Sequence, residues 1–117
     1  MRDPKERVRD MLEAIAAIER YRDRDRSTFE KDELLQVWFL RHLQITGEAA
    51  CRLPEEIRNL ATDIPWHKII GMRNILVHGY FAIDLDAVWN AVQRDIPLLK
   101  PVMEALLKKL EDQGYGG

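Results

Sequence analysis

Hydrophobic residues recur at intervals of three and four along almost the whole chain, which is the spacing of one face of an α-helix. The first such run opens with Asp3 as a helix cap, Pro4 in the first turn and Glu6 three residues after the cap. It continues for about five turns, with apolar positions at Val8, Met11, Leu12, Ile15, Ile18 and Tyr21. No alternating pattern typical of a strand survives in the sequence. The first element is therefore predicted to be an amphipathic helix.

A second helix is predicted over residues 29–53, because the pattern resets at Ser27 and Thr28 and Pro54 ends it. Its apolar band is wide, comprising Leu35, Trp38, Phe39, Ile45, Ala49 and Leu53 on one side, with Leu34, Val37, Leu40 and Leu43 beside them. Such a band indicates burial on two sides, either between helices of the same chain or against a second subunit. A short turn or helix is expected over residues 55–60.

A third helix is predicted to start at residues 63–66, where a proline stands in the first turn. Gly79 is placed to end or bend this helix just after His78. A fourth helical stretch begins at Asp84 or Asp86.

Pro97 and Pro101 interrupt that fourth stretch, and Asp95 can cap a renewed helix, so a kink and a break are both open. The expected fold is all-α: an antiparallel bundle of four to five helices. We expect one domain over residues 1–117, with residues 113–117 as a disordered tail.

Composition narrows the function. A chain of 117 residues, 46% hydrophobic and 32% charged, suits one globular domain with a single core. Its net charge of −2 means that any nucleic-acid site must be a local concentration of basic residues. The single cysteine, Cys51, cannot form an internal disulfide and is expected to be a small buried hydrophobe. No secretory signal or long uncharged span is present, so a cytoplasmic protein with no membrane contact is expected.

The candidate chemistry lies in residues 71–80, where Arg73, Asn74, His78 and Tyr80 stand among apolar neighbours. On an ideal helix Asn74 and His78 share a face, whereas Arg73 and His78 lie about 140° apart. Either a distortion at Gly79 or a two-fold axis that pairs two such helices would bring arginine and histidine together. Histidine can transfer protons near neutral pH, and arginine presents a planar, charged fork to phosphate oxygens. The competing interpretation is a packed histidine and a surface arginine.

Read as R-N-x-x-x-H-G-Y, this segment resembles the R-x-x-x-x-H-x-Y signature of HEPN domains of the HepT toxin type. The likeness extends from about Val8 to the C-terminal helix. HepT-type proteins are helical, dimeric ribonucleases that a nucleotidyltransferase antitoxin silences. The resemblance therefore implies a homodimeric HEPN-like bundle with the composite site at the subunit interface.

The resemblance further implies that Arg73 and His78 are catalytic in metal-independent RNA cleavage, with no cofactor, and that Asn74 and Tyr80 support them. Its substrate would be tRNA or mRNA. Its partner would be an MntA-like nucleotidyltransferase antitoxin that attaches AMP to Tyr80. The alternative is a non-catalytic helical module that binds nucleotide or RNA or docks the nucleotidyltransferase.

The other residues that were considered for function do not form a comparable polar motif. The histidines and the cysteine show no zinc-binding spacing, and no Gly-rich phosphate loop is present. Trp66 and Trp89 are interpreted as core or interface anchors. His42 and His67 are interpreted as structural residues, and the role of Glu48 stays open.

Overall fold

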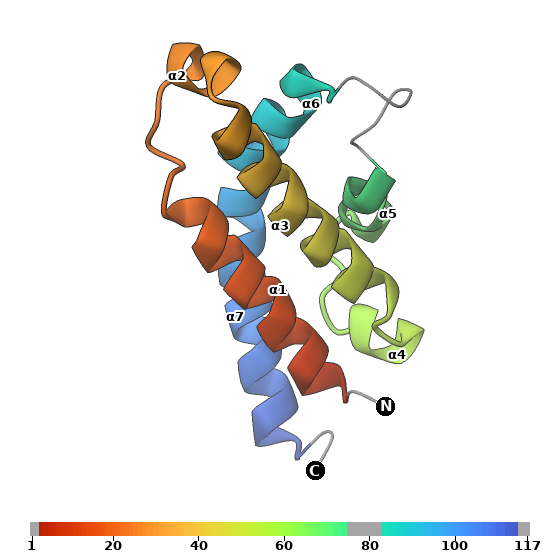
Figure 1. Ribbon diagram of the computed structural model, residues 1–117. Helices are drawn as coiled ribbons and strands as arrows, with labels where there is room; N and C mark the ends of the chain where they lie inside the picture. The colour runs from red at the N-terminus through yellow and green to blue at the C-terminus, as the bar shows by residue number, and fades with distance from the viewer. Residues whose placement is uncertain (1–2, 75–82, 115–117) are drawn as a thin grey trace.

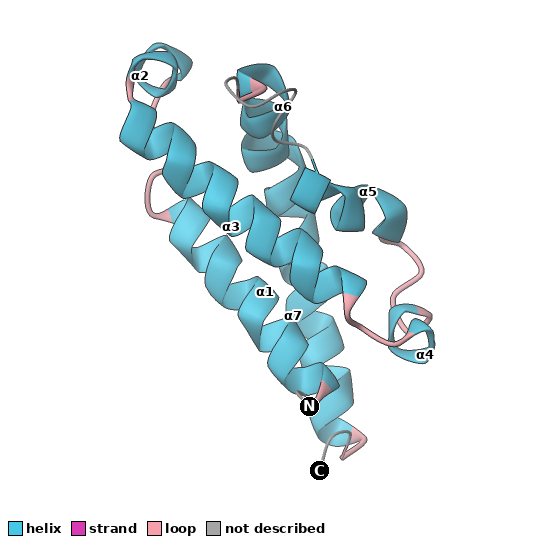
Figure 2. Cartoon of the chain, turned by 45° about the vertical axis from the view of Figure 1, so that its right-hand side comes forward, coloured by secondary structure: helices cyan, strands magenta, loops and turns pink. Residues whose placement is uncertain are grey.

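The structure, a computed structural model, describes residues 3–74 and 83–114 (Figure 1), and all regular elements within those ranges are helices (Figure 2). The all-α class and the antiparallel bundle are thereby confirmed. The tail that was expected over residues 113–117 follows the last helix, and its residues 115–117 lie outside the described ranges. In chain order the elements are α1 (Pro4–Glu19), α2 (Arg26–Lys31), α3 (Glu33–Cys51), α4 (Glu55–Arg58), α5 (Trp66–Gly71), the 3-10 helix η1 (Met72–Asn74), α6 (Leu85–Asn90), the π-helical segment η2 (Ala91–Asp95) and α7 (Ile96–Asp112).

Helix α3 is the centre of the bundle. It packs against α1 on one side and against α5 and η1 on another, and α1 also packs against α7 (Figure 1). The wide apolar band is therefore covered by helices of the same chain, with Leu35, Phe39 and Leu43 buried. The band is narrower than predicted, because the side chains of Leu34 and Val37 are 83% and 49% exposed.

Aspartate caps set the starts of several helices. The predicted caps at Asp3 and Asp84 are confirmed, since their carboxylates accept bonds from the backbone N–H of Glu6 and Ala87, both at 3.0 Å. The predicted single helix over residues 29–53 is wrong at its start. Asp32 leaves the helical conformation between α2 and α3, and its carboxylate caps α3.

A further cap, Asp25, starts α2 by accepting a bond from the backbone N–H of Thr28 at 2.8 Å. This bond favours the charged carboxylate, so the pKa of Asp25 lies below its usual value. The turn between α1 and α2 is therefore held in part by a local interaction that favours an ionised aspartate.

Aromatic side chains tie the helices together. Phe29 of α2 is fully buried between Phe39 of α3 and Trp89 of α6, with ring centroids 5.8 and 5.3 Å away. The indole N–H of Trp66 donates to the carbonyl of Ala61 at 2.9 Å. The prediction that Trp66 and Trp89 serve as packing anchors is thus confirmed.

The chain runs from α6 into α7 without leaving the helical conformation, which answers the open question at Pro97. Pro97 has no N–H, so it cannot bond the carbonyl four residues earlier, that of Gln93, or the carbonyl five residues earlier, that of Val92. Arg22 donates to both of these carbonyls: its Nε lies 3.2 Å from the carbonyl oxygen of Val92, and its Nη2 lies 3.2 Å from that of Gln93. The carbonyl of Arg22 in turn accepts from the Gln93 amide at 2.9 Å.

Asp95 does not act as the predicted cap of α7. Its backbone stays helical, and its carboxylate instead accepts from the Nζ of Lys68 at 2.9 Å. This ion pair joins the π-helical segment to α5, the helix that leads into the candidate site.

Candidate functional site

Arg73 and Asn74 lie in η1, directly after α5. The third helix was predicted to be α-helical through the motif, but it becomes a 3-10 helix at Met72, and Pro65 stands before its first turn rather than in it. The angle between Arg73 and His78 was derived for an ideal α-helix. It therefore does not apply to Arg73, which lies in a 3-10 helix. His78, Gly79 and Tyr80 lie outside the described residues, so their expected placement beside Arg73 stays a prediction.

Gly47 of α3 sets the position of η1. A Cβ atom on this glycine would lie 2.6 Å from the backbone nitrogen of Arg73 and 3.1 Å from the carbonyl oxygens of Ile69 and Ile70. Only a residue without a side chain permits this approach of two backbones. The backbone of Arg73 is thus placed by packing against α3.

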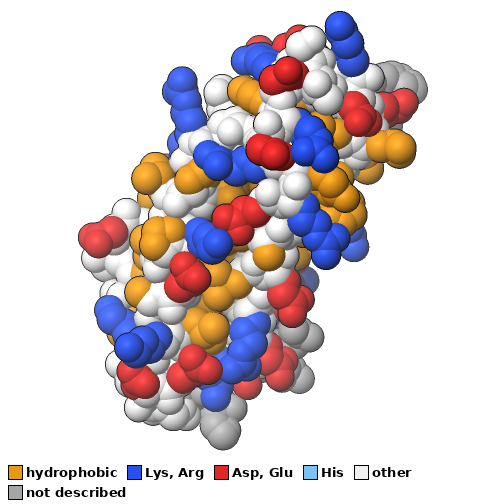
Figure 3. Space-filling view, turned by 90° about the vertical axis from the view of Figure 1, so that its left-hand side faces the viewer, with side chains coloured by type: hydrophobic (Ala, Val, Ile, Leu, Met, Phe, Trp, Pro, Cys, Tyr) orange, Lys and Arg blue, Asp and Glu red, His pale blue; other side chains and the backbone are white. Residues whose placement is uncertain are grey.

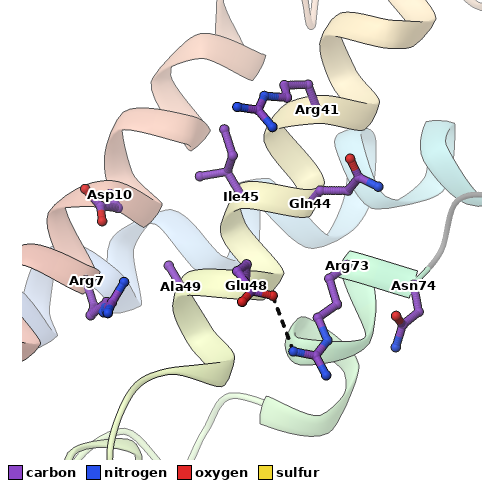
Figure 4. A pocket seen from close by; sticks show the side chains of 9 residues that line it. All are labelled: Arg7, Asp10, Arg41, Gln44, Ile45, Glu48, Ala49, Arg73 and Asn74. Atoms are coloured by element: carbon purple, nitrogen blue, oxygen red, sulfur yellow. Dashed lines mark hydrogen bonds and ion pairs between the residues drawn. The ribbon is translucent and has the colours of Figure 1, made fainter. Parts of the chain in front are cut away.

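The Arg73 side chain turns towards Glu48 of α3 (Figure 4) and also reaches Cys51 on the same helix. Its Nη1 donates to a carboxylate oxygen of Glu48 at 3.3 Å and contacts the Sγ of Cys51 at 3.0 Å. Glu48 also accepts from the Nε of Arg52 at 2.9 Å. Cys51 was expected to be a small buried hydrophobe. It is half-buried instead, and its Sγ contacts Arg73.

The Arg73 side chain is 39% exposed, so solvent and ligands can reach it. An ion pair of this exposure contributes little to stability and can be exchanged for another anion. The arrangement suits a guanidinium that is pre-oriented by a carboxylate and still able to bind phosphate oxygens.

Arg73 lies at the edge of a groove of about 560 Å³ between α1, α3 and η1. Figure 4 shows its side chains: Arg7 and Asp10 from α1, Arg41, Gln44, Ile45, Glu48 and Ala49 from α3, and Arg73 and Asn74 from η1. The size is within the range of small-molecule sites, roughly 300–1,000 Å³. Three guanidinium groups face two carboxylates there, so the groove is locally basic in an acidic chain.

Sequence reasoning missed Arg7, Arg41 and Gln44. A signal existed: Arg41, Gln44 and Glu48 recur at three and four residues and so form a polar stripe on a helix that is otherwise largely apolar. No pattern within α3 could show that the stripe faces Arg7 on α1.

The surface shown in Figure 3 differs from the groove. Acidic and basic side chains are interspersed there with hydrophobic ones, so that face presents no field of a single sign. Exposed ion pairs also join helices. Arg9 pairs with Glu111 at 3.3 Å and Lys100 pairs with Glu19 at 3.0 Å, and both pairs connect α1 to α7.

The remaining histidines differ in their surroundings. The Nδ1 of His42 lies 2.8 Å from the Trp38 carbonyl oxygen, and the imidazole packs against the Trp38 ring, tilted by 49° with the centroids 4.5 Å apart. These contacts support the structural interpretation of His42. His67 is exposed on α5.

Residues 3–74 and 83–114 contain no group of three or more His, Cys, Asp or Glu side chains that could hold a metal ion. None of the helices in those ranges has the length and apolar character that crossing a membrane requires.

Comparison with known proteins places this geometry in context. The family model described as ribonuclease HepT-like matches residues 11–106. A probable ribonuclease HepT from Thermococcus cleftensis is 37% identical over 108 residues, which cover 92% of this chain and 98% of that protein. A putative RNase from Caldanaerobacter subterraneus subsp. tengcongensis is 37% identical over 92 residues, covering 79% of this chain and 82% of the relative.

A longer relative from Methanocaldococcus jannaschii is named as a gamma-glutamylcyclotransferase and putative RNase. It is 38% identical over 112 residues, which cover 95% of this chain but only 49% of that protein. No solved structure gives a significant match.

Proposed function

Because the chain belongs to the ribonuclease HepT-like family, we propose that it is the toxin of a toxin–antitoxin pair and cleaves RNA without a metal ion. The observation that carries the proposal is the placement of Arg73. Its guanidinium is oriented by Glu48 at the edge of a basic groove, within the motif that also holds His78. An always-charged, accessible guanidinium is suited to stabilising the charge that develops on phosphorus.

RNA supplies its own nucleophile, the 2′-hydroxyl, so the protein has three tasks. His78 removes the proton from the 2′-oxygen as that oxygen bonds to phosphorus. Arg73 binds the non-bridging oxygens in the transition state, and the 5′-oxygen leaves with a proton from His78 of the partner subunit. Asn74 orients the histidine or holds a ribose oxygen, and Tyr80 stacks on a base. The products are a 2′,3′-cyclic phosphate and a free 5′-hydroxyl.

This mechanism requires a homodimer with the two motifs at the interface. Apolar surface is available to a partner, because Leu34, Val37 and Leu98 are large hydrophobic residues that remain exposed. Sedimentation should give a dimer at micromolar concentration. An active monomer would contradict the composite site. Mixed dimers of one wild-type and one His78→Ala subunit should be inactive, because each cleavage uses the histidines of both subunits.

Regulation is proposed at Tyr80. An MntA-like nucleotidyltransferase antitoxin would transfer AMP from ATP to its hydroxyl, adding bulk and negative charge near Arg73. The phosphate of AMP would then compete with RNA for the same guanidinium. Co-expression with the antitoxin should give Tyr80 peptides heavier by AMP and silence cleavage, and Tyr80→Phe should escape the modification. A fully neutralised complex with unmodified Tyr80 would favour steric inhibition instead.

The deciding experiment for the activity is product analysis with purified protein and tRNA or mRNA. The wild type should leave 2′,3′-cyclic phosphate ends, and His78→Ala should abolish cleavage and growth inhibition without loss of helicity. Arg9→Ala is the matched control, since Arg9 forms only an exposed ion pair with Glu111. Binding with intact RNA would favour the alternative, a non-catalytic RNA-binding or nucleotidyltransferase-docking module, for which the basic groove alone is sufficient.

A further inference from the structure

We propose that the groove between α1, α3 and η1 binds an RNA backbone phosphate next to the one that is cleaved, with Arg7 and Arg41 as its cationic ligands. The inference rests on the proposed function in taking RNA as the ligand. It concerns residues on α1 and α3, outside the motif that carries the proposed chemistry.

The groove is continuous with the candidate site, because Arg73 and Asn74 form part of its lining. Figure 4 shows Arg41 and Arg7 on α3 and α1, with Ala49 and Glu48 between Arg7 and Arg73 and with Ile45 between Arg41 and Ala49. An RNA strand whose scissile phosphate contacts Arg73 would therefore have the groove beside it.

The charges of the two arginines are available. Within the described residues neither Arg7 nor Arg41 forms an ion pair, whereas Arg9, Arg24, Arg26 and Arg52 each pair with a carboxylate. Glu48, one of the two carboxylates in the groove, is already engaged by Arg52 and Arg73. These two guanidinium groups can therefore bind an anion without first breaking an ion pair within the described residues.

The chemistry of the lining matches an extended polyanion. Arginine binds phosphate through two parallel N–H donors, and the amides of Gln44 and Asn74 can donate to phosphate or ribose oxygens. The half-buried side chain of Ile45 offers an apolar surface for a sugar or base. Single-strand binding sites combine a basic groove that follows the backbone with surfaces for the nucleotides in the same way.

The test uses a short RNA in which 2′-O-methyl groups block the nucleophile, so binding is measured without cleavage. Arg7→Ala/Arg41→Ala should weaken binding about tenfold. For this double variant, the slope of log affinity against log salt concentration should be shallower by about 0.7 for each phosphate contact that is lost. The control Arg9→Ala/Arg94→Ala removes the same charge from exposed residues that do not line the groove. Equal affinity and equal salt slope in both double variants would overturn the proposal.

A scan with methylphosphonates locates the contact. Each neutral linkage removes one backbone charge, so a substitution beside the cleavage position should weaken binding by the wild type but not by Arg7→Ala/Arg41→Ala. Similar losses for both proteins at every position would contradict a discrete subsite. Circular dichroism of the variants verifies that they fold, and the single exposed variant Arg41→Ala should show the same trend with a smaller effect.

The outcomes separate this inference from the proposed function. If the wild type fails to cleave any RNA, but the salt slope behaves as expected and one neutral linkage weakens binding by the wild type alone, the groove binds RNA and the ribonuclease proposal fails. If cleavage occurs and the double variant binds and cleaves like its control, only the subsite is wrong. Competition by inorganic phosphate or AMP at the affinity of the oligonucleotide would also overturn it, in favour of a site for a free anion.

Discussion

Arg22 and Arg73 differ in the kind of atoms that their guanidinium groups contact. Arg22 donates to the backbone carbonyls of Val92 and Gln93, in a helical segment that Pro97 leaves one N–H short. Within the described residues the Arg73 guanidinium contacts the side chains of Glu48 and Cys51, and Arg73 and Glu48 line an open groove. Loss of backbone bonds would disturb the fold, whereas side-chain contacts can be replaced by those of a ligand. The partner atoms, rather than the residue type, separate a structural arginine from a candidate functional one.

The largest expected effect is the loss of activity in Arg73→Ala. RNA cleavage should fall by at least about a hundredfold, because a charged group that stabilises the transition state is removed. The free energy of unfolding should change by no more than about 0.5 kcal/mol, since the side chain is partly exposed and its ion pair is weak. Single-turnover cleavage and urea unfolding measure the two quantities. A large loss of stability would move Arg73 to the structural group.

Arg22→Ala should have the opposite result. Two backbone carbonyls in the π-helical segment would lose their donors, which should lower the free energy of unfolding by about 2 kcal/mol. Cleavage per folded molecule should be unchanged. The matched control is Arg9→Ala, because Arg9 forms an exposed ion pair with Glu111. Equal stability of the two variants would show that water replaces the Arg22 bonds at no loss.

A smaller effect sharpens the role of Pro97. Pro97→Ala restores a backbone N–H that can bond one of the carbonyls that Arg22 serves, so Arg22→Ala should be less destabilising in that background. We expect a coupling of about 1 kcal/mol in the double-mutant cycle, measured by chemical unfolding. Additive effects would mean that the proline and the arginine act independently.

The smallest expected effect concerns Glu48. Glu48→Gln keeps an acceptor near Arg73 but removes a negative charge from the groove, so binding of the non-cleavable RNA should tighten about threefold at low salt. The gain should disappear at high salt. Arg52 also loses its charged partner in this variant, and therefore Arg52→Ala serves as the control. Weaker binding by Glu48→Gln would indicate that orientation of Arg73 matters more than the local charge.

Much of the fold follows from local sequence signals. The caps at Asp3 and Asp84 and the apolar face of α1 depend on residues within one or two turns, and the structure confirms them. The break at Asp32 was missed because Leu34 and Leu35 continue the apolar pattern across it. Its own signal, an aspartate followed by Glu33 in a first turn, was also present. A local cap can thus override a hydrophobic pattern.

The candidate site was less accessible to such reasoning. The motif identified Arg73 and Asn74, but the groove beside them depends on which faces of α1 and α3 meet. The partners of Arg22 lie 70 and 71 positions away along the chain. The sequence around Arg22 by itself shows only alternating charges, which are typical of a solvated helix end. Contacts over such distances are set by packing of the whole bundle and have no signature in a short window.

The close contact at Gly47 has a consequence for redesign of this protein. Side chains around the groove can be exchanged while η1 keeps its place, since the main chain of Arg73 rests directly on the main chain of α3. A single added methyl group at position 47 has no such freedom, because the atoms in its way belong to the backbone. Specificity can thus be altered widely at the rim of the groove, while the whole site depends on the missing side chain at one position beneath it.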